Sequence, residues 1–323
     1  MTAASAPEQQ SQALVALEDI VKHFPTGTRV AHAVSRVTLD IRRGETLSLV
    51  GESGSGKTTL ARCLARLCDV TSGRVVFDGK DITHFDFDEL RPIRKRIQFI
   101  FQDPFGSLNP RHRIGSIIGE PLVVHGEADG AELREMVERL METVGLEPSH
   151  YDRYPAEFSG GQRQRISIAR AIALRPDLVI CDEPVSALDV SVRAQILNLL
   201  QDLQKQLGLT YLFISHDLPV VRHVSDRVAV MYLGKIVELA PVEALFEQPQ
   251  HPYTQVLLDS APVPDPDAQP QIILDGDPPS LIEPPTGCSF HTRCPKAEVK
   301  CSTDVPELLY DGNRRTACHF PLG

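Results

Sequence analysis

The sequence has 323 residues, a formal net charge of −10 and an apolar content of 42%. This length suits one large domain or two smaller ones with an ordinary core, and the acidic balance argues against direct nucleic-acid binding, which requires clustered Lys and Arg. No apolar run is long enough to cross a membrane, and residues 1–12 lack the basic and apolar regions of a signal peptide, so a disordered tail is expected there.

Short apolar runs alternate with helical patterns from about residue 13 to residue 240. Continuous apolar runs are typical of strands in a parallel sheet that is covered on both faces. Three such strands are predicted, at TLSLV (46–50), LVICD (178–182) and TYLFIS (210–215). Helices are predicted at 130–145, which is amphipathic, and at 251–258, and the prolines of PVPDPDAQP (262–270) predict an extended linker.

GESGSGKT (51–58) follows a predicted strand and precedes a helical pattern, which is the setting of a phosphate-binding loop. Backbone N–H groups of such a loop face the phosphates, Lys57 would reach the β- and γ-phosphates, and the Thr58 hydroxyl would bind Mg²⁺. The alternative is a glycine-rich turn without a ligand, and the loop alone does not distinguish kinases, GTPases and ATPases. The residues expected to contact nucleotide are Gly51, Glu52, Ser53, Gly54, Ser55, Gly56, Lys57, Thr58 and Thr59.

Asp182 and Glu183 stand at the end of the predicted strand LVICD. Adjacent residues at a strand end point to different sides, so the two carboxylates can have different roles. Asp182 suits the outer coordination sphere of Mg²⁺, and Glu183 suits a general base or a group that orients the attacking water. The alternative is a pair of acidic residues that caps the following turn. Cys181, one position earlier, is expected to pack in the core.

FSGGQRQRISIARAIALRPD (158–177) resembles the signature of the ABC-type ATPases, usually LSGGQ, and its first five residues differ from that motif only at the first. A Ser-Gly-Gly turn that opens a helix presents N–H groups to an anion, and the serine can also serve as the N-cap. The resemblance implies that this turn contacts the γ-phosphate of an ATP molecule held by the other subunit of a dimer. The residues concerned are Ser159, Gly160, Gly161 and Gln162.

The same resemblance assigns four further residues. Gln102 matches the loop glutamine that senses Mg²⁺ and the transmembrane partner, and Asp189, in SALD, matches the acid of a loop that crosses the dimer. His216 matches the switch histidine that contacts the γ-phosphate, although a lone His at a strand end can be structural. Phe24 is a candidate for stacking on adenine, where the family more often has Tyr, or else a core residue. Glu183, His216 and Gln102 are thus the expected catalytic residues.

The resemblance implies an α/β fold, an ABC-type P-loop ATPase with a RecA-like core, an antiparallel β subdomain and an inserted helical subdomain. A small Cys-containing C-terminal extension follows. The expected boundaries are 1–12 for the tail, 13–260 for the ATPase domain, about 104–160 for the helical subdomain within it, and 261–323 for the extension.

Longer stretches look like the ATPase subunits of oligopeptide, dipeptide and nickel importers: DPFGSLNPR (103–111), YPAEFSGGQRQR (154–165), DEPVSALDVSVRAQILNLL (182–200) and GDPPSLIEPPTGCSFHTRC (276–294). The resemblance implies ATP hydrolysis that powers peptide import, with nickel import as the alternative and a non-transport ABC ATPase as a more distant one. The implied partners are a second ATPase subunit, often a different chain, two membrane permease subunits and an extracytoplasmic solute-binding protein. The implied location is the cytoplasmic face of the cell membrane.

Four of the seven cysteines lie near the C-terminus, separated by five, six and sixteen residues: Cys288, Cys294, Cys301 and Cys318. The short C-x2–4-C pair of most zinc sites is missing, and four thiolates are the usual ligands of a [4Fe–4S] cluster. The tail of the resembled subfamily is associated with such a cluster, which is therefore the favoured interpretation over zinc or free thiols. His291 and His319 would flank this site, while Cys63 and Cys68 would pack on the helix after the phosphate loop.

Overall fold

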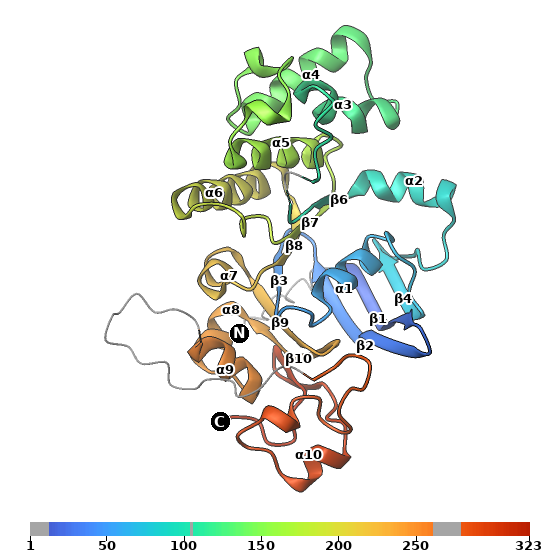
Figure 1. The fold of residues 1–323 in the computed structure, drawn as a ribbon, viewed down its shortest axis with the longest axis vertical. Coiled ribbons are helices and arrows are strands. Elements are labelled where there is room, and N and C mark those ends of the chain that lie inside the picture. The colour runs from blue at the N-terminus through green and yellow to red at the C-terminus, as the bar shows by residue number, and fades with distance from the viewer. Residues whose placement is uncertain (1–12, 104–105, 261–278) are drawn as a thin grey trace, which may run out of the picture.

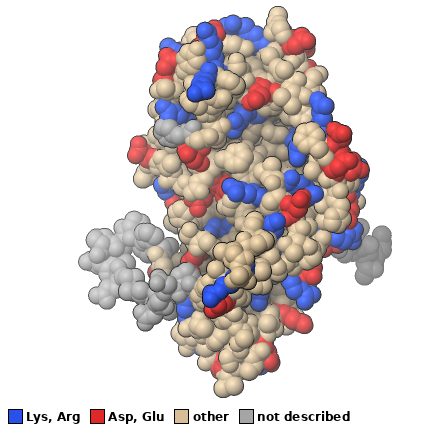
Figure 2. Space-filling model, turned by 45° about the vertical axis from the view of Figure 1, so that its right-hand side comes forward, with Lys and Arg blue, Asp and Glu red and all other residues tan. Residues whose placement is uncertain are grey.

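The computed structural model describes residues 13–103, 106–260 and 279–323 (Figure 1). The expected tail at 1–12 and the expected linker at 262–270 lie outside the described residues. On the face shown in Figure 2, Lys and Arg side chains are interspersed with Asp and Glu rather than gathered in one basic area.

The larger sheet consists, within the described residues, of β3 (Thr46–Val50), β6 (Ile97–Ile100), β7 (Leu178–Asp182), β8 (Thr210–Ile214), β9 (Arg227–Tyr232), β10 (Lys235–Pro241), β11 (Leu309–Asp311) and β12 (Arg314–Thr316). Its strand order is β11-β12-β10-β9-β3-β8-β7-β6. The strands from β9 to β6 in this order pair in parallel, whereas β10, β12 and β11 extend the sheet in antiparallel pairing.

The predicted core strands are confirmed. TLSLV and LVICD form β3 and β7 with the predicted bounds, and β8 ends at Ile214, one residue before the predicted end. Every residue of these three strands is buried, because helices or strands cover both faces of the sheet.

A smaller antiparallel sheet has the order β2-β1-β4-β5 and is built from β1 (Ala13–Thr26), β2 (Arg29–Arg42), β4 (Ser72–Phe77) and β5 (Lys80–Asp81). Helix α1 (Lys57–Leu64) lies beside it (Figure 1). One buried cluster joins Leu17 and Leu39 of this sheet, Leu60 of α1, and Leu47 of the larger sheet. The helix that follows the phosphate loop is thereby fixed to both sheets.

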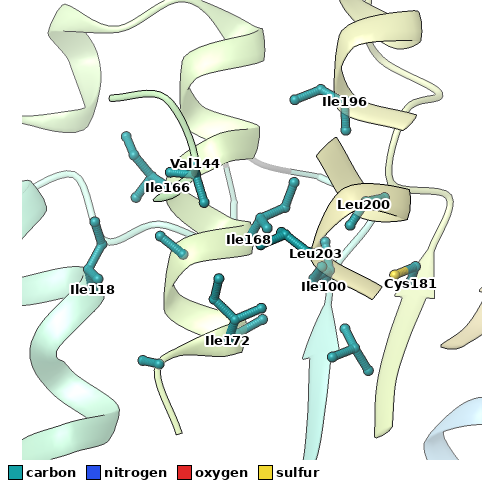
Figure 3. Close-up of a cluster of buried hydrophobic side chains, with 14 of the residues drawn as sticks. Ile100, Ile118, Val144, Ile166, Ile168, Ile172, Cys181, Ile196, Leu200 and Leu203 are labelled. Carbon is teal, nitrogen blue, oxygen red and sulfur yellow. The ribbon is translucent and has the colours of Figure 1, made fainter. Parts of the chain in front are cut away.

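A second cluster packs helices on the other side of the larger sheet. The helices are α3 (Ile114–Val124), α4 (Gly130–Thr143), α5 (Gly160–Ile172) and α6 (Val190–Leu207). Ile118 of α3, Ile168 of α5 and Leu200 of α6 belong to one cluster with Ile100 and Cys181 of the sheet, and in Figure 3 α5 lies between Ile118 and the sheet. Cys181 is fully buried here, as predicted, and the predicted amphipathic helix is confirmed as α4.

The shorter helices are α2 (Phe87–Arg96), α7 (Leu218–Val224), α8 (Val242–Glu247), α9 (Pro252–Asp259) and α10 (Val299–Thr303), with 3-10 turns at Pro148–His150, Pro155–Glu157 and His291–Arg293. Helix α9 confirms the helix predicted at 251–258. Among the described helices, none is both long enough and apolar enough to span a bilayer.

Residues 279–323, called the C-terminal segment below, pack directly on the rest of the chain. Strand β12 pairs with β10, so the hairpin β11–β12 extends the larger sheet. Phe290 is 1% exposed and its ring lies 5.3 Å from the rings of both Tyr232 and Tyr253. The segment therefore shares a hydrophobic cluster with β9 and α9.

Candidate functional site

The glycine-rich loop connects β3 to α1, as its sequence predicts. Two glycines of the loop cannot be replaced by a residue with a side chain. A Cβ atom on Gly51 would lie 2.1 Å from the Met231 carbonyl oxygen, and a Cβ atom on Gly56 would lie 2.2 Å from the Ala33 carbonyl oxygen. Both residues also have positive φ angles, +150° and +103°. The backbone of the loop thus curls tightly at the N-terminus of α1, where N–H groups can face an anion.

Lys57 and Thr58 begin α1 and face inward. The Lys57 side chain is buried, and its Nζ donates to the carbonyl oxygens of Gly51 and Glu52, at 2.8 Å each. Burial lowers the pKa of Lys57, while the carboxylates of Glu183, Asp182 and Glu52 oppose that shift. The ammonium group is therefore held by carbonyl oxygens of the loop, close enough to three carboxylates to be stabilised by their charge.

Thr58 and Asp182 join the loop to the end of β7. The Thr58 hydroxyl donates to Asp182 Oδ1 at 3.0 Å, and Asp182 is 4% exposed. Burial raises the pKa of Asp182, and the hydrogen bond from Thr58 opposes the shift. A hydroxyl and a carboxylate oxygen, both hard ligands that suit Mg²⁺, thus lie side by side at the predicted site.

Glu183 is placed by an unusual backbone conformation. Its φ angle is +47°, in the left-handed region that non-glycine residues rarely adopt, and its N–H donates to the Ile214 carbonyl oxygen at 3.0 Å. Its carboxylate accepts from Gln102 Nε2 at 2.8 Å and lies 3.0 Å from His216 Nδ1. Asp182 and Glu183 therefore have different partners, as the alternation at a strand end predicts.

Gln102, Glu183 and His216 come from three different parts of the chain and meet at one edge of the sheet. Each follows the end of a parallel strand, namely β6, β7 or β8. The carboxyl ends of parallel strands are where open α/β sheets bind ligands. The His216 side chain is 63% exposed and that of Glu183 17%, so the group opens to solvent at this edge.

The Ser-Gly-Gly turn begins α5 with a capping box. Ser159 Oγ accepts from the Gln162 N–H, and Gln162 Oε1 accepts from the Ser159 N–H at 3.0 Å. Its predicted role as the N-cap is confirmed. Ser159, Gly160, Gly161 and Gln162 stand at the start of α5. Figure 1 shows α5 beside α3 and α4 and apart from α1, the helix that the phosphate loop opens.

Asp189 and Phe24 are both on the surface. Asp189 is the N-cap of α6, and its carbonyl oxygen accepts from the Arg193 N–H at 2.8 Å. Phe24 of β1 is 41% exposed, with Lys22 Nζ 4.9 Å from its ring centroid. Phe24 is therefore not a core residue, and its ring is partly open to solvent, with Lys22 over one face.

The four C-terminal cysteines line one pocket. It is formed by Cys288, Cys294, Cys301 and Cys318 together with Phe290, His251, His291 and His319. Burial raises the pKa of Cys288, Cys294 and Cys318, the last to about 11, and at least one other cysteine of the group adds to each shift. Among the described residues, no group of three or more His, Cys, Asp or Glu side chains is arranged to hold a metal ion.

The two histidines expected to flank the cysteines do so, and each bonds to backbone. His291 Nδ1 is 2.9 Å from the Cys288 carbonyl oxygen, and His319 Nε2 is 2.9 Å from that of Asp304. The expectation that both Cys63 and Cys68 lie on the helix after the loop is wrong for Cys68, because α1 ends at Leu64. Cys68 nevertheless stays close, with its Sγ 3.4 Å from that of Cys63.

Comparisons with known proteins identify the family of this chain. Residues 34–186 match the family model described as ABC transporter, and residues 237–301 match that described as oligopeptide/dipeptide transporter, C-terminal region. The chain is 52% identical over 319 residues to a probable peptide ABC transporter ATP-binding protein of Sinorhizobium fredii, with 96% of this chain and 90% of the relative covered. The chain belongs to the ABC transporter ATP-binding family.

Two further likenesses extend over most of both chains. The oligopeptide transport ATP-binding protein AppF of Bacillus subtilis is 49% identical, with 99% of each chain covered. The solved dimeric structure of the ATP-binding cassette MJ0796, in a post-hydrolysis state bound to ADP and Pi, matches with a TM-score of 0.65 and 32% identity. It covers 71% of this chain and 98% of that one.

Membership of the ABC family confirms the expected fold, an α/β cassette with an antiparallel β subdomain and a mixed core sheet. It also implies ATP and Mg²⁺ as the ligands of the loop. The described boundaries of sheets and helices do not test the predicted division at 104–160 or at 261, which stays a prediction.

Two residues that contact the loop, Tyr253 and Arg293, were missed by the sequence reasoning. The Tyr253 hydroxyl oxygen accepts from the Glu52 N–H at 2.9 Å. The Arg293 guanidinium pairs with the Glu52 carboxylate at 2.9 and 3.1 Å, and also reaches the Tyr232 hydroxyl at 3.4 Å. The only available signal was the resemblance of 276–294 to a subfamily tail, which does not say what the tail contacts.

Proposed function

We propose that this chain binds and hydrolyses ATP to power the import of peptides through an ABC transporter. The observation that carries the proposal is the group of Lys57, Thr58, Asp182 and Glu183 at the carboxyl edge of the sheet, within a chain that matches the oligopeptide/dipeptide transporter C-terminal region. Relatives that cover nearly the whole chain have names in peptide or oligopeptide transport.

ATP would bind with its phosphates over the loop 51–59. Lys57 would turn from the carbonyl oxygens that it now contacts to the β- and γ-phosphates. Thr58 and Asp182, already 3.0 Å apart, and Gln102 would hold Mg²⁺, which neutralises charge on the phosphates when bound. The exposed face of Phe24 would stack on adenine.

Glu183 would take a proton from the attacking water. Its two oxygens are held by Gln102 and His216, so the carboxylate is oriented before a substrate arrives. The His216 side chain is 63% exposed, so it would be free to contact the γ-phosphate of a bound ATP. The left-handed backbone at Glu183 is consistent with a strained residue at a reacting centre.

Two ATPase subunits would close on two ATP molecules, each bound between one phosphate loop and the opposite signature turn. The position of α5, which Ser159, Gly160 and Gly161 open, apart from α1 supports this arrangement, as does the dimeric structure of the related MJ0796 cassette. Asp189 would then lie on the loop that crosses the dimer. ATP can drive closure only through tighter binding to the closed state.

The proposed assembly holds a second ATPase subunit, two permease subunits and an extracytoplasmic solute-binding protein. This chain would sit peripherally at the cytoplasmic face of the membrane, with the residues after Gln102 receiving a helix from a permease. An uptake experiment tests the substrate. Cells lacking the chain would be complemented with wild type or with Glu183→Gln, and supplied with labelled tripeptide or with labelled nickel.

Recovery of peptide uptake by the wild type but not by the Gln variant is the expected result. Recovery of nickel uptake alone would replace the peptide proposal by the nickel importer. Recovery of neither solute, in cells where ATP hydrolysis by the chain is measurable, would refute both substrates.

We also propose that Cys288, Cys294, Cys301 and Cys318 hold a [4Fe–4S] cluster. The support is that four thiols, the usual ligand set of such a cluster, line one pocket. Their side chains would have to move closer together to bind it, because among the described residues no three are arranged to hold a metal ion. When bound, the cluster would connect parts of the C-terminal segment that are separate in sequence. Purification without oxygen, followed by iron, sulfide and zinc analysis, tests the proposal. About four irons and four sulfides per chain are expected, one zinc would indicate a zinc site, and none of these would indicate free thiols.

A further inference from the structure

Glu52, the second residue of the phosphate loop, is held by three other parts of the chain. Its carbonyl oxygen accepts from Lys57, its N–H donates to the Tyr253 hydroxyl oxygen of α9, and its carboxylate pairs with Arg293 of the C-terminal segment. Backbone and side chain are thus both fixed, one residue after the tightly packed Gly51. A displacement of Glu52 would therefore also displace the loop backbone that is expected to face the phosphates.

The pair between Arg293 and Glu52 has the geometry of a strong one. Two nitrogens of the guanidinium reach two oxygens of the carboxylate, at 2.9 and 3.1 Å. The Arg293 side chain is 7% exposed, so water competes little for these bonds. Two-pronged, charge-assisted contacts of this kind fix direction as well as distance.

The backbone of Arg293 is fixed by the cysteine pocket. Arg293 ends the 3-10 turn His291–Arg293, which lies between Cys288 and Cys294. Phe290, which precedes the turn, is wedged against Tyr232 and Tyr253, and these two tyrosines are the other neighbours of Arg293 and Glu52. One packed group therefore joins the pocket to the phosphate loop.

We propose that Arg293 is a positioning residue for nucleotide binding: it holds Glu52, and through Glu52 the phosphate loop, in the conformation that binds phosphate. The C-terminal segment then sets the affinity of the loop for nucleotide, since a loop ordered in advance loses less freedom on binding. This inference rests on the proposed function, in which residues 51–59 bind ATP.

The experiment measures MgADP binding to the full-length chain by calorimetry, because MgADP engages the loop without turnover. Arg293→Met keeps the length of the side chain and removes both bonds, and it is expected to raise Kd about tenfold, which corresponds to about 1.4 kcal/mol. Arg293→Lys keeps the positive charge but cannot donate through two nitrogens to both carboxylate oxygens, so Kd is expected to rise about threefold. Glu52→Gln is also expected to raise Kd about threefold, because it weakens the pair from the other side.

The double variant Glu52→Gln with Arg293→Met separates positioning from general damage. If both residues act through the one ion pair, the Kd of the double variant equals that of Arg293→Met within about twofold, because Arg293→Met alone already removes the pair. Arg315→Met is the matched control. Arg315 also belongs to the C-terminal segment, is mostly buried and pairs with Asp40 at 2.6 Å, but it does not reach the loop, so Kd should stay within about twofold.

Additive effects of the two changes, or an unchanged Kd in Arg293→Met, would overturn the proposal. Should Arg293→Met fail to fold, Glu52→Gln and Arg293→Lys still decide the matter, and wild-type Kd in both would count against it. Lys57→Ala reports separately on the proposed function. If that variant bound MgADP normally, the loop would not be the nucleotide site at all, whatever Arg293 does.

Discussion

Replacement of Glu183 by glutamine tests the assignment of the base most directly. The side chain keeps its size and an oxygen that can accept from Gln102, but it can no longer take a proton. The lost contact to His216 is partly exposed, so it is worth less than about 1 kcal/mol and the fold should survive. A positioned base contributes about 10²- to 10⁴-fold in rate, which is roughly 3 to 5 kcal/mol at 1.36 kcal/mol per decade.

Two measurements check this prediction. In a single-turnover assay, Glu183→Gln should hydrolyse ATP at least about a hundredfold more slowly than wild type, and its Kd for MgATP should change by less than about twofold. ATP should then accumulate unhydrolysed in a closed dimer, visible as a shift on gel filtration. Glu243→Gln is the control, since Glu243 likewise lies close to a basic side chain, Arg222 at 2.8 Å, but is on the surface of α8, away from the site. Hydrolysis by Glu183→Gln at the wild-type rate would show that another group is the base.

Two further predictions concern stability. Phe290→Ala should lower the free energy of unfolding by about 3 to 5 kcal/mol, because the ring is 1% exposed. Phe87→Ala is the control: this residue is 70% exposed, so the free energy of unfolding should change by less than about 0.5 kcal/mol. Thermal melts of the two variants test the difference. Burial lowers the pKa of His251 to about 3, so below pH 6.5 only the unfolded chain binds this proton and stability falls by about 1.4 kcal/mol per pH unit as pH drops towards 3. His251→Asn keeps an acceptor for the Tyr253 N–H, so urea unfolding at pH 7 and pH 5 should show a smaller loss than in wild type, and an equal loss would exclude His251 as the cause.

Much of the site was predictable because its chemistry is local. A phosphate loop needs glycine where a Cβ atom would collide, a lysine for the phosphates and a hydroxyl for Mg²⁺, all within one short stretch. Asp182 and Glu183 could be placed because LVICD can only be a buried strand, and parallel strands bring their ends to one edge. The meeting of Gln102, Glu183 and His216 follows from the same rule.

The end of α1 shows where local signals fail. The helical pattern continues to Leu67, but the helix stops at Leu64 because Arg66 adopts a left-handed conformation, with φ of +53°. A left-handed residue at a helix C-terminus is usually glycine, so an arginine at this position does not predict that the helix ends there. Arg66 is held in place by a contact distant in sequence, from its Nε to the Ile82 carbonyl oxygen at 3.0 Å. The misplaced Cys68 follows from this tertiary constraint.

Phe24 illustrates a different limit. An aromatic residue in a strand is compatible with core and with surface, and the sequence left both open. The structure decides for the surface, because β1 pairs with β2 through a ladder that has several register shifts before the strand reaches Phe24. Alternation along a strand predicts a face only while the register holds.

Glu52 lies within the phosphate-loop motif, but its contacts to Tyr253 and Arg293 come from the tertiary fold and not from the motif. Gly51, Gly56 and Lys57 are fixed by steric fit and by the phosphates, so a motif identifies them. The side chain at position 52 bonds instead to Arg293, 241 residues away along the chain, and the backbone N–H of Glu52 donates to Tyr253, 201 residues away. Such contacts exist only once the C-terminal segment has packed on β9 and α9. A local motif therefore identifies the residues of the phosphate loop. It does not reveal the distant C-terminal segment that, in our proposal, sets the affinity of this loop for nucleotide.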